Sequence, residues 1–192
     1  MRACAIVLTG VITAGCARSA ESIAAPTFEQ LATESLAQID GRMELAGLNA
    51  EVQVLRDEWG VPHIYANNVD DLFFAQGFVV AQDRLWQMEI WRRTAEGRLS
   101  ELVGPAALKH DKLYRLFRYR GPFDAAEWSS YHPDGKRIFS AYAAGINAFI
   151  ASAGDKLPVE FRLTGIRPEP WTAEQLLLRA RVSDRSTTRG RS

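Results

Sequence analysis

The first regular pattern of hydrophobic and polar positions begins after Pro26 and has the period of an α-helix. Thr27 can accept a hydrogen bond from the free backbone N–H groups of a first turn, and Gln30 stands at the reciprocal position of a capping box. The apolar positions that recur at helical spacing are Phe28, Leu31, Leu36 and Ile39. Gly41 ends the pattern, so the sequence predicts a helix over residues 27–41 with one apolar face.

Residues 43–66 have the shorter period of β-strands. Val52 and Val54 point to one side of an extended segment, with polar residues between them. A turn follows, and residues 61–66 form a second extended segment. Because Pro62 cannot donate a hydrogen bond to a neighbouring strand, this second strand should begin there or lie at a sheet edge. The two segments predict a β-hairpin.

A long helical pattern follows the predicted hairpin and continues to about Glu96. Asp70 or Asp71 is expected to cap its start, because negative side chains favour the N-terminal end of a helix. Gly97 fits a C-terminal cap. The apolar stripe of this helix consists of Phe74, Phe78, Ala81, Leu85 and Met88.

Between Gly97 and residue 133 the helical patterns are shorter. Residues 99–108 form short pieces broken at Gly104, and residues 113–119 predict a turn or two of helix. Residues 133–153 predict an amphipathic helix that Gly154 closes. Its apolar face consists of Ile138, Tyr142, Ile146 and Phe149.

Residues 157–170 are punctuated by proline and predict an extended stretch. Thr172 and Gln175 then have the spacing of another capping box, and Trp171 with Leu176 can form a hydrophobic staple. A further helix should therefore begin here and continue well beyond this first turn.

The helical pattern breaks after Val182. Residues 183–192 are polar, have no periodicity and include Arg185, Arg189 and Arg191, a composition typical of disorder. We therefore expect one ordered region over residues 27–182, followed by an aberrant tail. A truncation, for instance through a frameshift, is the expected origin of that tail.

Composition and charge suit a globular protein. Hydrophobic residues make up 47% of the 192 positions and charged residues 24%. The formal net charge is zero, so nothing in the overall balance favours nucleic acid as a partner. No apolar run approaches the roughly 20 residues that a membrane-spanning helix needs.

The N-terminus resembles an export signal over residues 1–20. Arg2 is followed by an apolar stretch of signal-peptide size, and Cys16 closes a segment similar to a bacterial lipoprotein cleavage box. Either Cys16 carries a lipid, or a plain secretory signal is cleaved a few residues later, for instance after Ala20. The expected location is periplasmic or lipid-anchored in the cell envelope. Removal of the signal also removes Cys4, which leaves no pair of cysteines for a disulfide.

No self-contained active site is evident in the sequence. There is no Gly-x-Ser-x-Gly, His-Glu-x-x-His, Cys-x-x-Cys or phosphate-binding loop. His63, His110 and His132 are scattered and lack the spacing of metal ligands. A lone histidine beside a turn, such as His63, is more often a structural hydrogen-bonding residue than a catalytic one.

The long helix carries the strongest candidates for polar chemistry. Asp83, Arg84 and Glu89 can form an ion pair that fixes the helix, with Arg84 meeting an acid from the hairpin or from its own helix, or they can contact a substrate. Trp86 and Trp91 are expected to pack rather than to form a ligand platform. The following pair, Arg92 and Arg93, is expected on a solvated face, with Arg93 near Glu89 or Glu96.

Several ordered motifs resemble the N-terminal part of the penicillin acylase (penicillin amidase) family. They cover residues 42–182. The motifs are RDEWGVPHIYA at 56–66, AQDRLWQME at 81–89, GRLSELVG at 97–104, YAAGINAFI at 142–150, LPVEFR at 157–162 and RPEPWT at 167–172.

The resemblance implies an α+β fold, mainly helical here with a short β-hairpin, as the α-chain part of an N-terminal nucleophile hydrolase αββα sandwich. It implies an exported precursor that cuts itself into an α chain and a β chain. The new N-terminal serine of the β chain is the nucleophile, with its own α-amino group as the base. The complete family enzyme is expected to bind calcium, and its substrates include β-lactam side-chain amides and acyl-homoserine lactones.

By this resemblance, the chain corresponds to most of an α chain. No serine in it follows a glycine, the small residue that usually precedes the family nucleophile, so no catalytic, substrate-binding or metal-binding residue can be assigned. The expected partner is the missing β chain. Three possibilities stay open: an amidase fragment inactive alone, a non-functional remnant, and a non-enzymatic exported binding protein.

Overall fold

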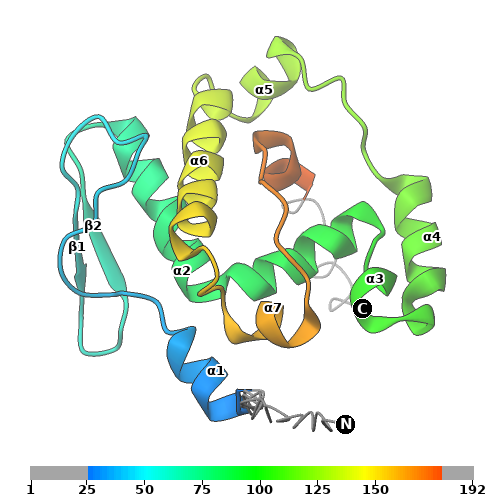
Figure 1. Cartoon of the computed structure of the whole chain (residues 1–192). Helices are drawn as coiled ribbons and strands as arrows, with labels where there is room; N and C mark the ends of the chain where they lie inside the picture. Colours follow the sequence, from blue (N-terminus) through cyan, green and yellow to red (C-terminus); the bar gives the residue numbers. More distant parts are fainter. Residues whose placement is uncertain (1–25, 179–192) are drawn as a thin grey trace, which may run out of the picture.

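The computed structural model describes residues 26–178, and the fold is mainly helical with one short hairpin (Figure 1). This confirms the predicted fold class, while the described residues form part, not the whole, of an αββα sandwich. The elements in chain order are α1 Phe28–Glu34, β1 Gln53–Arg56, β2 Pro62–Tyr65, α2 Val69–Glu96, α3 Ser100–Val103, η1 Pro105–Ala107, α4 Leu108–Phe117, α5 Ala125–Tyr131, α6 Gly135–Ala153 and α7 Val159–Thr164. Residues 173–178 are also helical.

The 28-residue helix α2 is the axis around which the other elements are arranged. Gly97 ends it in the left-handed conformation, as predicted, and its predicted apolar stripe is buried. The predicted cap was wrong, because the side chain of Asn68 accepts the hydrogen bond from Asp71 N. Both aspartates lie inside the first turn. Arg84 has non-helical φ and ψ of −141° and 17°, which divides α2 into two parts.

α6 crosses α2, and two glycines allow the backbones to approach closely (Figure 1). A Cβ added to Gly145 would lie 1.9 Å from Phe74 O, and one added to Gly77 would lie 2.0 Å from Tyr142 O. The core forms around this crossing, where Ala81, Met88 and Ile146 are fully buried. The amphipathic pattern over residues 133–153 predicted this helix and its apolar face, and the structure shows that the face packs on α2.

The hairpin pairs Gln53 with Tyr65 and Arg56 with Pro62 in antiparallel register. The turn between the strands is held by Asp57, whose carboxylate accepts hydrogen bonds from Trp59 N and Val61 N. β2 begins at Pro62, which confirms the prediction that the second strand starts at this proline. The sheet contains these two strands within residues 26–178, and Ile64 packs on the core.

Two predicted segments differ in the structure. Helix α1 has the predicted capping box but ends at Glu34, and Leu36 and Ile39 are exposed. A longer helix would gain no burial there, because no described element lies against that face. The stretch over residues 157–170, predicted to be extended, contains α7 instead. Phe161 of α7 is buried, so tertiary packing overrides the local proline signal.

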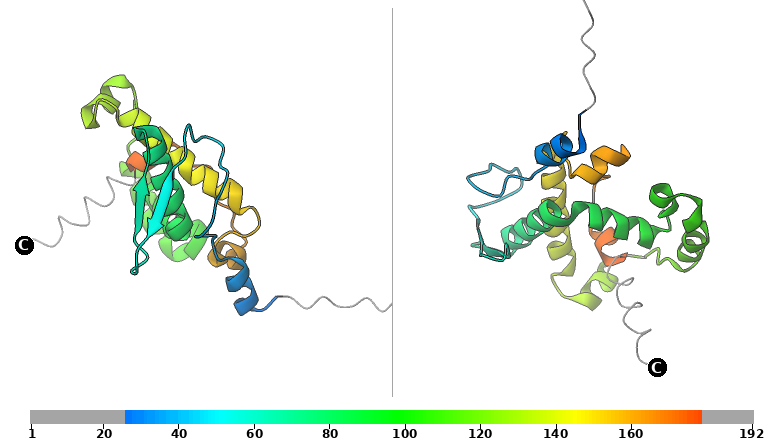
Figure 2. Two further views of the ribbon diagram at one scale, coloured as in Figure 1. Left: turned by 90° about the vertical axis from the view of Figure 1, so that its left-hand side faces the viewer. Right: turned by 90° about the horizontal axis from the view of Figure 1, so that it is seen from below.

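The remaining helices extend along and beyond α2. The predicted helix over residues 113–119 is α4, which starts earlier and ends at Phe117. α5 was not predicted, and its Asp124 cap and buried Trp128 hold it beside α6. The hairpin runs beside the N-terminal half of α2, whereas α3 and α4 lie at its C-terminal end (Figure 2).

Candidate functional site

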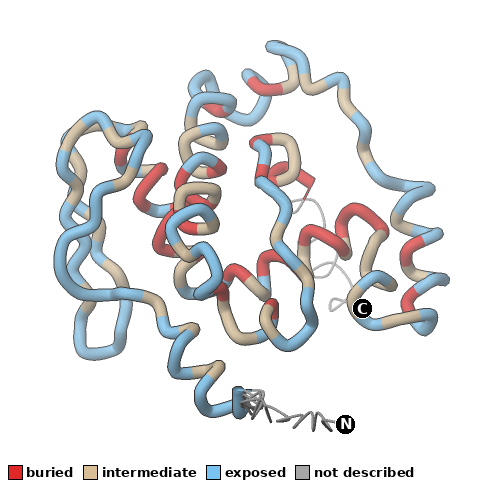
Figure 3. Tube along the Cα trace, in the orientation of Figure 1, coloured by how far each residue is buried: buried red, intermediate tan, exposed pale blue. Residues whose placement is uncertain are grey.

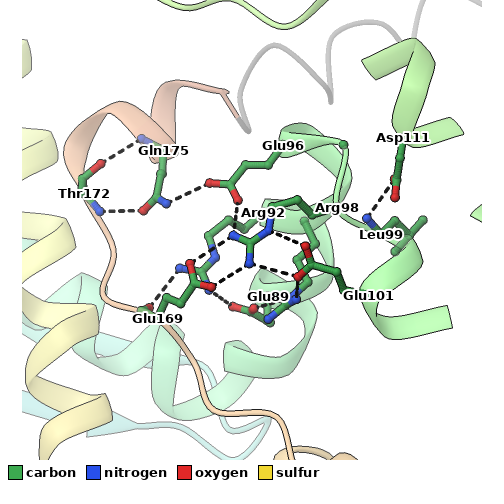
Figure 4. Close-up of polar contacts among 12 residues, drawn as sticks. Glu89, Arg92, Glu96, Arg98, Leu99, Glu101, Asp111, Glu169, Thr172 and Gln175 are labelled. Atoms are coloured by element: carbon green, nitrogen blue, oxygen red, sulfur yellow. Dashed lines mark hydrogen bonds and ion pairs between the residues drawn. The ribbon is translucent and has the colours of Figure 1, made fainter. Parts of the chain in front are cut away.

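The most organised polar cluster of the chain surrounds Glu89 on α2 (Figure 4). Glu89 is fully buried, and its two carboxylate oxygens accept hydrogen bonds from Arg92 Nη2 at 2.5 Å and Arg93 Nε at 2.6 Å. Both arginines are buried as well. The predicted ion pair on this helix is confirmed for Glu89, while the expectation that Arg92 and Arg93 are solvated was wrong. Two guanidinium groups are needed here because an unpaired buried carboxylate is very costly.

Arg98 extends the cluster toward the surface. Its guanidinium binds Glu169 at 2.7 Å, Glu101 at 2.9 Å and Glu96 at 3.0 Å. Arg93 also binds Glu101, so the buried and outer parts of the cluster are continuous. We call Glu89, Arg92, Arg93, Glu96, Arg98, Glu101 and Glu169 the charge cluster.

The charge cluster holds the chain where the last described helix begins. Arg92 Nη1 donates to Glu169 O at 3.0 Å, and Gln175 Nε2 donates to Glu96 Oε1 at 2.9 Å. The guanidinium of Arg92 also lies 5.1 Å from the ring centre of Trp171. The predicted capping box of Gln175 with Thr172 is confirmed by both of its hydrogen bonds.

Asn147 of α6 fixes the same point from the other side. Its side-chain oxygen accepts from Trp171 N at 2.7 Å, and its Nδ2 donates to Trp171 O at 2.9 Å. Residues 169–175 are thus tied to both long helices, which fixes where the last described helix begins and packs its buried Leu176 and Leu177 into the core.

The electrostatics of these groups favour permanent charges. Arg98 holds the pKa of Glu169 down at about 2, and it also lowers the pKa of Glu101. The pKa of Arg98 rises above its ordinary value because Glu169 and Glu101 accept its hydrogen bonds. Carboxylates that stay ionised and guanidiniums that stay protonated cannot exchange protons near neutral pH. Arg98, Glu101 and Glu169 are therefore suited to positioning, not to acid–base catalysis.

Two buried aspartates fasten loops in the same manner. Asp71 accepts from Asn49 N at 2.8 Å and Ala50 N at 2.9 Å. Asp111 accepts from Leu99 N at 2.9 Å and Ser100 N at 2.8 Å. Burial alone would raise the pKa of each aspartate, but the hydrogen bonds outweigh burial and lower it.

The other candidates named from the sequence are separated in space. Asp83 of α2 binds Arg56 of the hairpin at 2.8 Å, which is not the pair that the sequence predicted for Arg84. Arg84 is exposed beside it. Trp86 packs edge-on against Phe161 with ring centres 4.9 Å apart, which confirms a packing role.

Each histidine has a local structural contact. His63 Nε2 lies 3.2 Å from Asp57 Oδ2, His110 stacks on Tyr114, and His132 Nδ1 accepts from Asp134 N at 3.1 Å. The structural interpretation of His63 is thereby confirmed. Within residues 26–178, no group of three His, Cys, Asp or Glu side chains could hold a metal ion. Calcium binding by the complete family enzyme stays a prediction.

A second feature is a set of exposed apolar residues on the hairpin and on α1, two elements that are largely exposed in Figure 3. Trp59 at the hairpin tip is 82% exposed, and its neighbours Val61 and Tyr65 are also exposed. Phe28 of α1 lies outward as well. Exposed large apolar side chains of this kind are candidates for contact with another protein surface.

Part of this organisation had a sequence signal. Glu89 with Arg92 and Arg93 has the i, i+3 and i, i+4 spacing of helical ion pairs. Glu169 was missed as a member of the cluster because 71 positions separate it from Arg98 in sequence. The possible lipid site Cys16 and the tail over residues 183–192 lie outside the described residues. Among the helices at residues 26–178, none is long and apolar enough to span a bilayer.

Comparison with known proteins gives a consistent result. Residues 51–191 match the sequence model of the penicillin amidase family. The penicillin acylase 2 proenzyme of Pseudomonas sp. strain SE83 is 41% identical over 150 residues, which are 78% of this chain and 19% of that protein. The acyl-homoserine lactone acylase QuiP of Pseudomonas aeruginosa is 39% identical over 147 residues, or 76% of this chain and 17% of QuiP.

A solved structure is also similar. One chain of the thermostable penicillin G acylase from Alcaligenes faecalis superposes with a TM-score of 0.59 and 32% identity. The superposition covers 67% of this chain and 69% of that chain. The chain thus spans about a fifth of the length of its sequence relatives but more than two thirds of one chain of the solved enzyme.

Proposed function

Because this chain belongs to the penicillin amidase family, we propose that it is the scaffold chain of an amidohydrolase whose nucleophile lies on a second polypeptide segment. The reaction is the hydrolysis of linear amide C–N bonds. The proposed substrates are acyl side chains of β-lactams or acyl-homoserine lactones, which are the classes named by its relatives.

One observation carries the proposal. The aligned segment occupies 17–19% of two proenzyme-length relatives but 69% of one chain of the solved acylase. A region that accounts for most of one chain in the solved enzyme is a structural unit, and the rest of the relatives' length supplies the other parts. Functions of that remainder, including the nucleophile, are therefore proposed for a partner and not for this chain.

The chemistry of the described residues agrees with this division. Every resolved pKa shift stabilises a charged form, and the carboxylates concerned are occupied by arginine, asparagine, histidine or backbone N–H groups. The exposed residues Trp59, Tyr65 and Phe28 provide apolar area for a partner. An unaccompanied binding protein would not be expected to expose such residues together.

The proposed reaction proceeds in two steps on the partner's N-terminal serine. The serine hydroxyl oxygen adds to the amide carbonyl carbon while the serine's α-amino group takes the hydroxyl proton. The C–N bond then breaks, and the amine leaves with that proton. Water hydrolyses the resulting ester, which releases the carboxylic acid and regenerates the hydroxyl. This chain contributes the fixed framework against which the partner folds.

Reconstitution tests the proposal. The purified chain alone is expected to leave benzylpenicillin and an acyl-homoserine lactone unhydrolysed. Mixed with the unmatched remainder of the SE83 proenzyme, it should form a complex that releases the acid and the amine. The control is a partner chain whose nucleophilic N-terminal serine is replaced by alanine. This partner should bind without turnover. Hydrolysis by the isolated chain, or absence of any complex, would contradict the proposal.

We also propose that the protein is exported and processed within residues 1–20. Support comes from the apolar stretch before Cys16 and from the small residues beside it. Mass spectrometry of the protein from membrane and periplasmic fractions distinguishes a lipid on Cys16 from cleavage near Ala20. A Cys16→Ser variant should leave the membrane fraction if Cys16 is lipidated. Recovery of the uncleaved chain in the cytoplasm would contradict export.

A further inference from the structure

Helix α4 packs on the end of α2 through its polar face. Asp111 is buried and accepts from Leu99 N and Ser100 N, while Arg115 Nε donates to Gly97 O at 2.7 Å. The loop that follows α2 is therefore held to α4 by polar contacts. Such contacts determine where α4 lies without using its large apolar side chains.

Those apolar side chains lie on the outer side of α4. Leu116 is 70% exposed, Phe117 62% and Leu113 53%. We call these three residues the α4 ridge. An amphipathic helix in an isolated domain normally turns its apolar face toward the core, so α4 has the opposite orientation.

Two exposed lysines lie beside the α4 ridge. Lys109, Leu113 and Leu116 follow the i, i+4, i+7 spacing and share one helix face. Lys112 is also exposed, one turn before Leu116. The chain has zero net charge overall, so this end of α2 has a local basic excess.

We propose that the α4 ridge is a docking surface for the segment that completes the precursor, and that this segment presents an apolar patch with a carboxylate opposite Lys109. The inference rests on the proposed function and adds a specific surface and its chemistry. The occupant follows from the relatives, of which about four fifths lies outside the matched segment. Charge complementarity defines the rest, since a desolvated lysine in an apolar contact needs an acidic group.

A lipid surface fits the ridge less well. Helices that lie in a membrane interface keep lysines on the polar face and present a broad apolar face to the acyl chains. Here Lys109 stands on the same face as Leu113 and Leu116, so its ammonium group would have to extend back out of the acyl region to reach the headgroups. A protein partner can place a carboxylate at that one position, whereas a bilayer cannot.

The position of the ridge separates it from the hairpin surface. α4 lies at the C-terminal end of α2, whereas the hairpin runs beside the N-terminal half of α2 (Figure 2), where Arg56 binds Asp83. A partner that covers both must reach from the first half of α2 to its C-terminal end. The two surfaces can therefore be tested independently by mutation.

Binding measurements with the unmatched remainder of the SE83 proenzyme test the inference. Leu116→Asp should weaken binding by about 10-fold or more, because a central apolar contact is replaced by a charge. Lys109→Glu should weaken binding by roughly 3- to 10-fold. The control Lys136→Glu, at an exposed position of α6, should change binding less than about 2-fold. Melting temperature and circular dichroism should match the wild type, because Leu116 is already exposed in the free chain.

The possible outcomes distinguish failure of the docking inference from failure of the proposed function. Wild-type binding that all α4 variants retain would overturn the docking inference and leave the proposed function intact. Failure of the wild type itself to bind would overturn both. Flotation with vesicles of phosphatidylglycerol and phosphatidylethanolamine, and sedimentation of the chain alone, are expected to show no ridge-dependent association. Vesicle binding or self-association abolished by Leu116→Asp would identify a different occupant and overturn the inference.

Discussion

α6 packs against α2 through its apolar face, whereas α4 packs against α2 through its polar face. α6 contributes apolar residues and Gly145, whose backbone comes so close to α2 that no side chain fits between them. α4 contributes Asp111 and Arg115 and leaves Leu116 and Phe117 exposed. The first contact is a domain core, and the second is a set of polar tethers.

The difference shows which parts of the chain can be stable before assembly. Apolar burial at the α2–α6 crossing is available to the chain alone. At α4, the tethers fix the helix while its apolar side chains gain nothing until another surface covers them. The charge cluster belongs with the core in this respect, because Glu89 and both of its arginines are buried. The predictions below test that division in order of expected effect.

Removal of Glu89 should be the most damaging single change. Glu89→Ala leaves Arg92 and Arg93 buried without their shared carboxylate, which should lower the free energy of unfolding by about 3–5 kcal/mol. Urea denaturation measures the loss. The control is Glu34→Ala, because Glu34 is 57% exposed in its 2.9 Å pair with Arg162 and that pair should contribute less than about 1 kcal/mol. Equal effects of the two variants would contradict the buried role of Glu89.

This contrast also shows what could be predicted from the sequence. Helical period predicted α2 and α6, and the shorter strand period predicted the hairpin, since these patterns depend on residues close in sequence. The burial of Arg92 was not predictable in this way, because it depends on Glu169 and Trp171, which α7 and its flanking turns bring back to α2. The outward orientation of the apolar face of α4 was likewise not predictable, because residue spacing identifies an apolar face but not the element that covers it.

Adding a side chain at the α2–α6 crossing should have the second largest effect on stability. Gly145→Ala places a methyl group 1.9 Å from Phe74 O, so α6 must move away from α2. Overpacking of this kind costs about 1–3 kcal/mol, and the contact with backbone favours the upper part of that range. Thermal and urea melts report it. Ala144→Ser adds one atom at the neighbouring exposed position and should stay within about 0.5 kcal/mol. A wild-type melt for Gly145→Ala would show that the crossing is looser than described.

Loss of the α4 tether should have a smaller and local effect. Asp111→Ala leaves Leu99 N and Ser100 N without their acceptor, which should cost about 1–2 kcal/mol. Hydrogen exchange should accelerate at amides of α3 and α4 while those of α6 keep their protection. Asp155→Ala, which removes an exposed pair with Arg167, is the matched control and should change neither region. Uniform acceleration across α6 would mean that α4 is part of the core after all.

The smallest effect should come from acid titration of the outer charge cluster. Arg98 lowers the pKa of Glu169 from 4.5 to about 2, so ionised Glu169 stabilises the folded chain above the unfolded pKa. That stabilisation should be lost as pH falls from about 4.5 toward 2, and it should be constant from pH 6 to 8. Glu169→Gln should therefore flatten part of the acid limb of a plot of melting temperature against pH and leave the neutral region parallel to the wild type. Because the Glu169 side chain is 48% exposed, solvent screening keeps the effect below that of Glu89. An acid limb unchanged by the substitution would show that Arg98 does not hold residues 169–175 through this carboxylate, and the link between the core and the last helix would rest on Asn147 and Arg92.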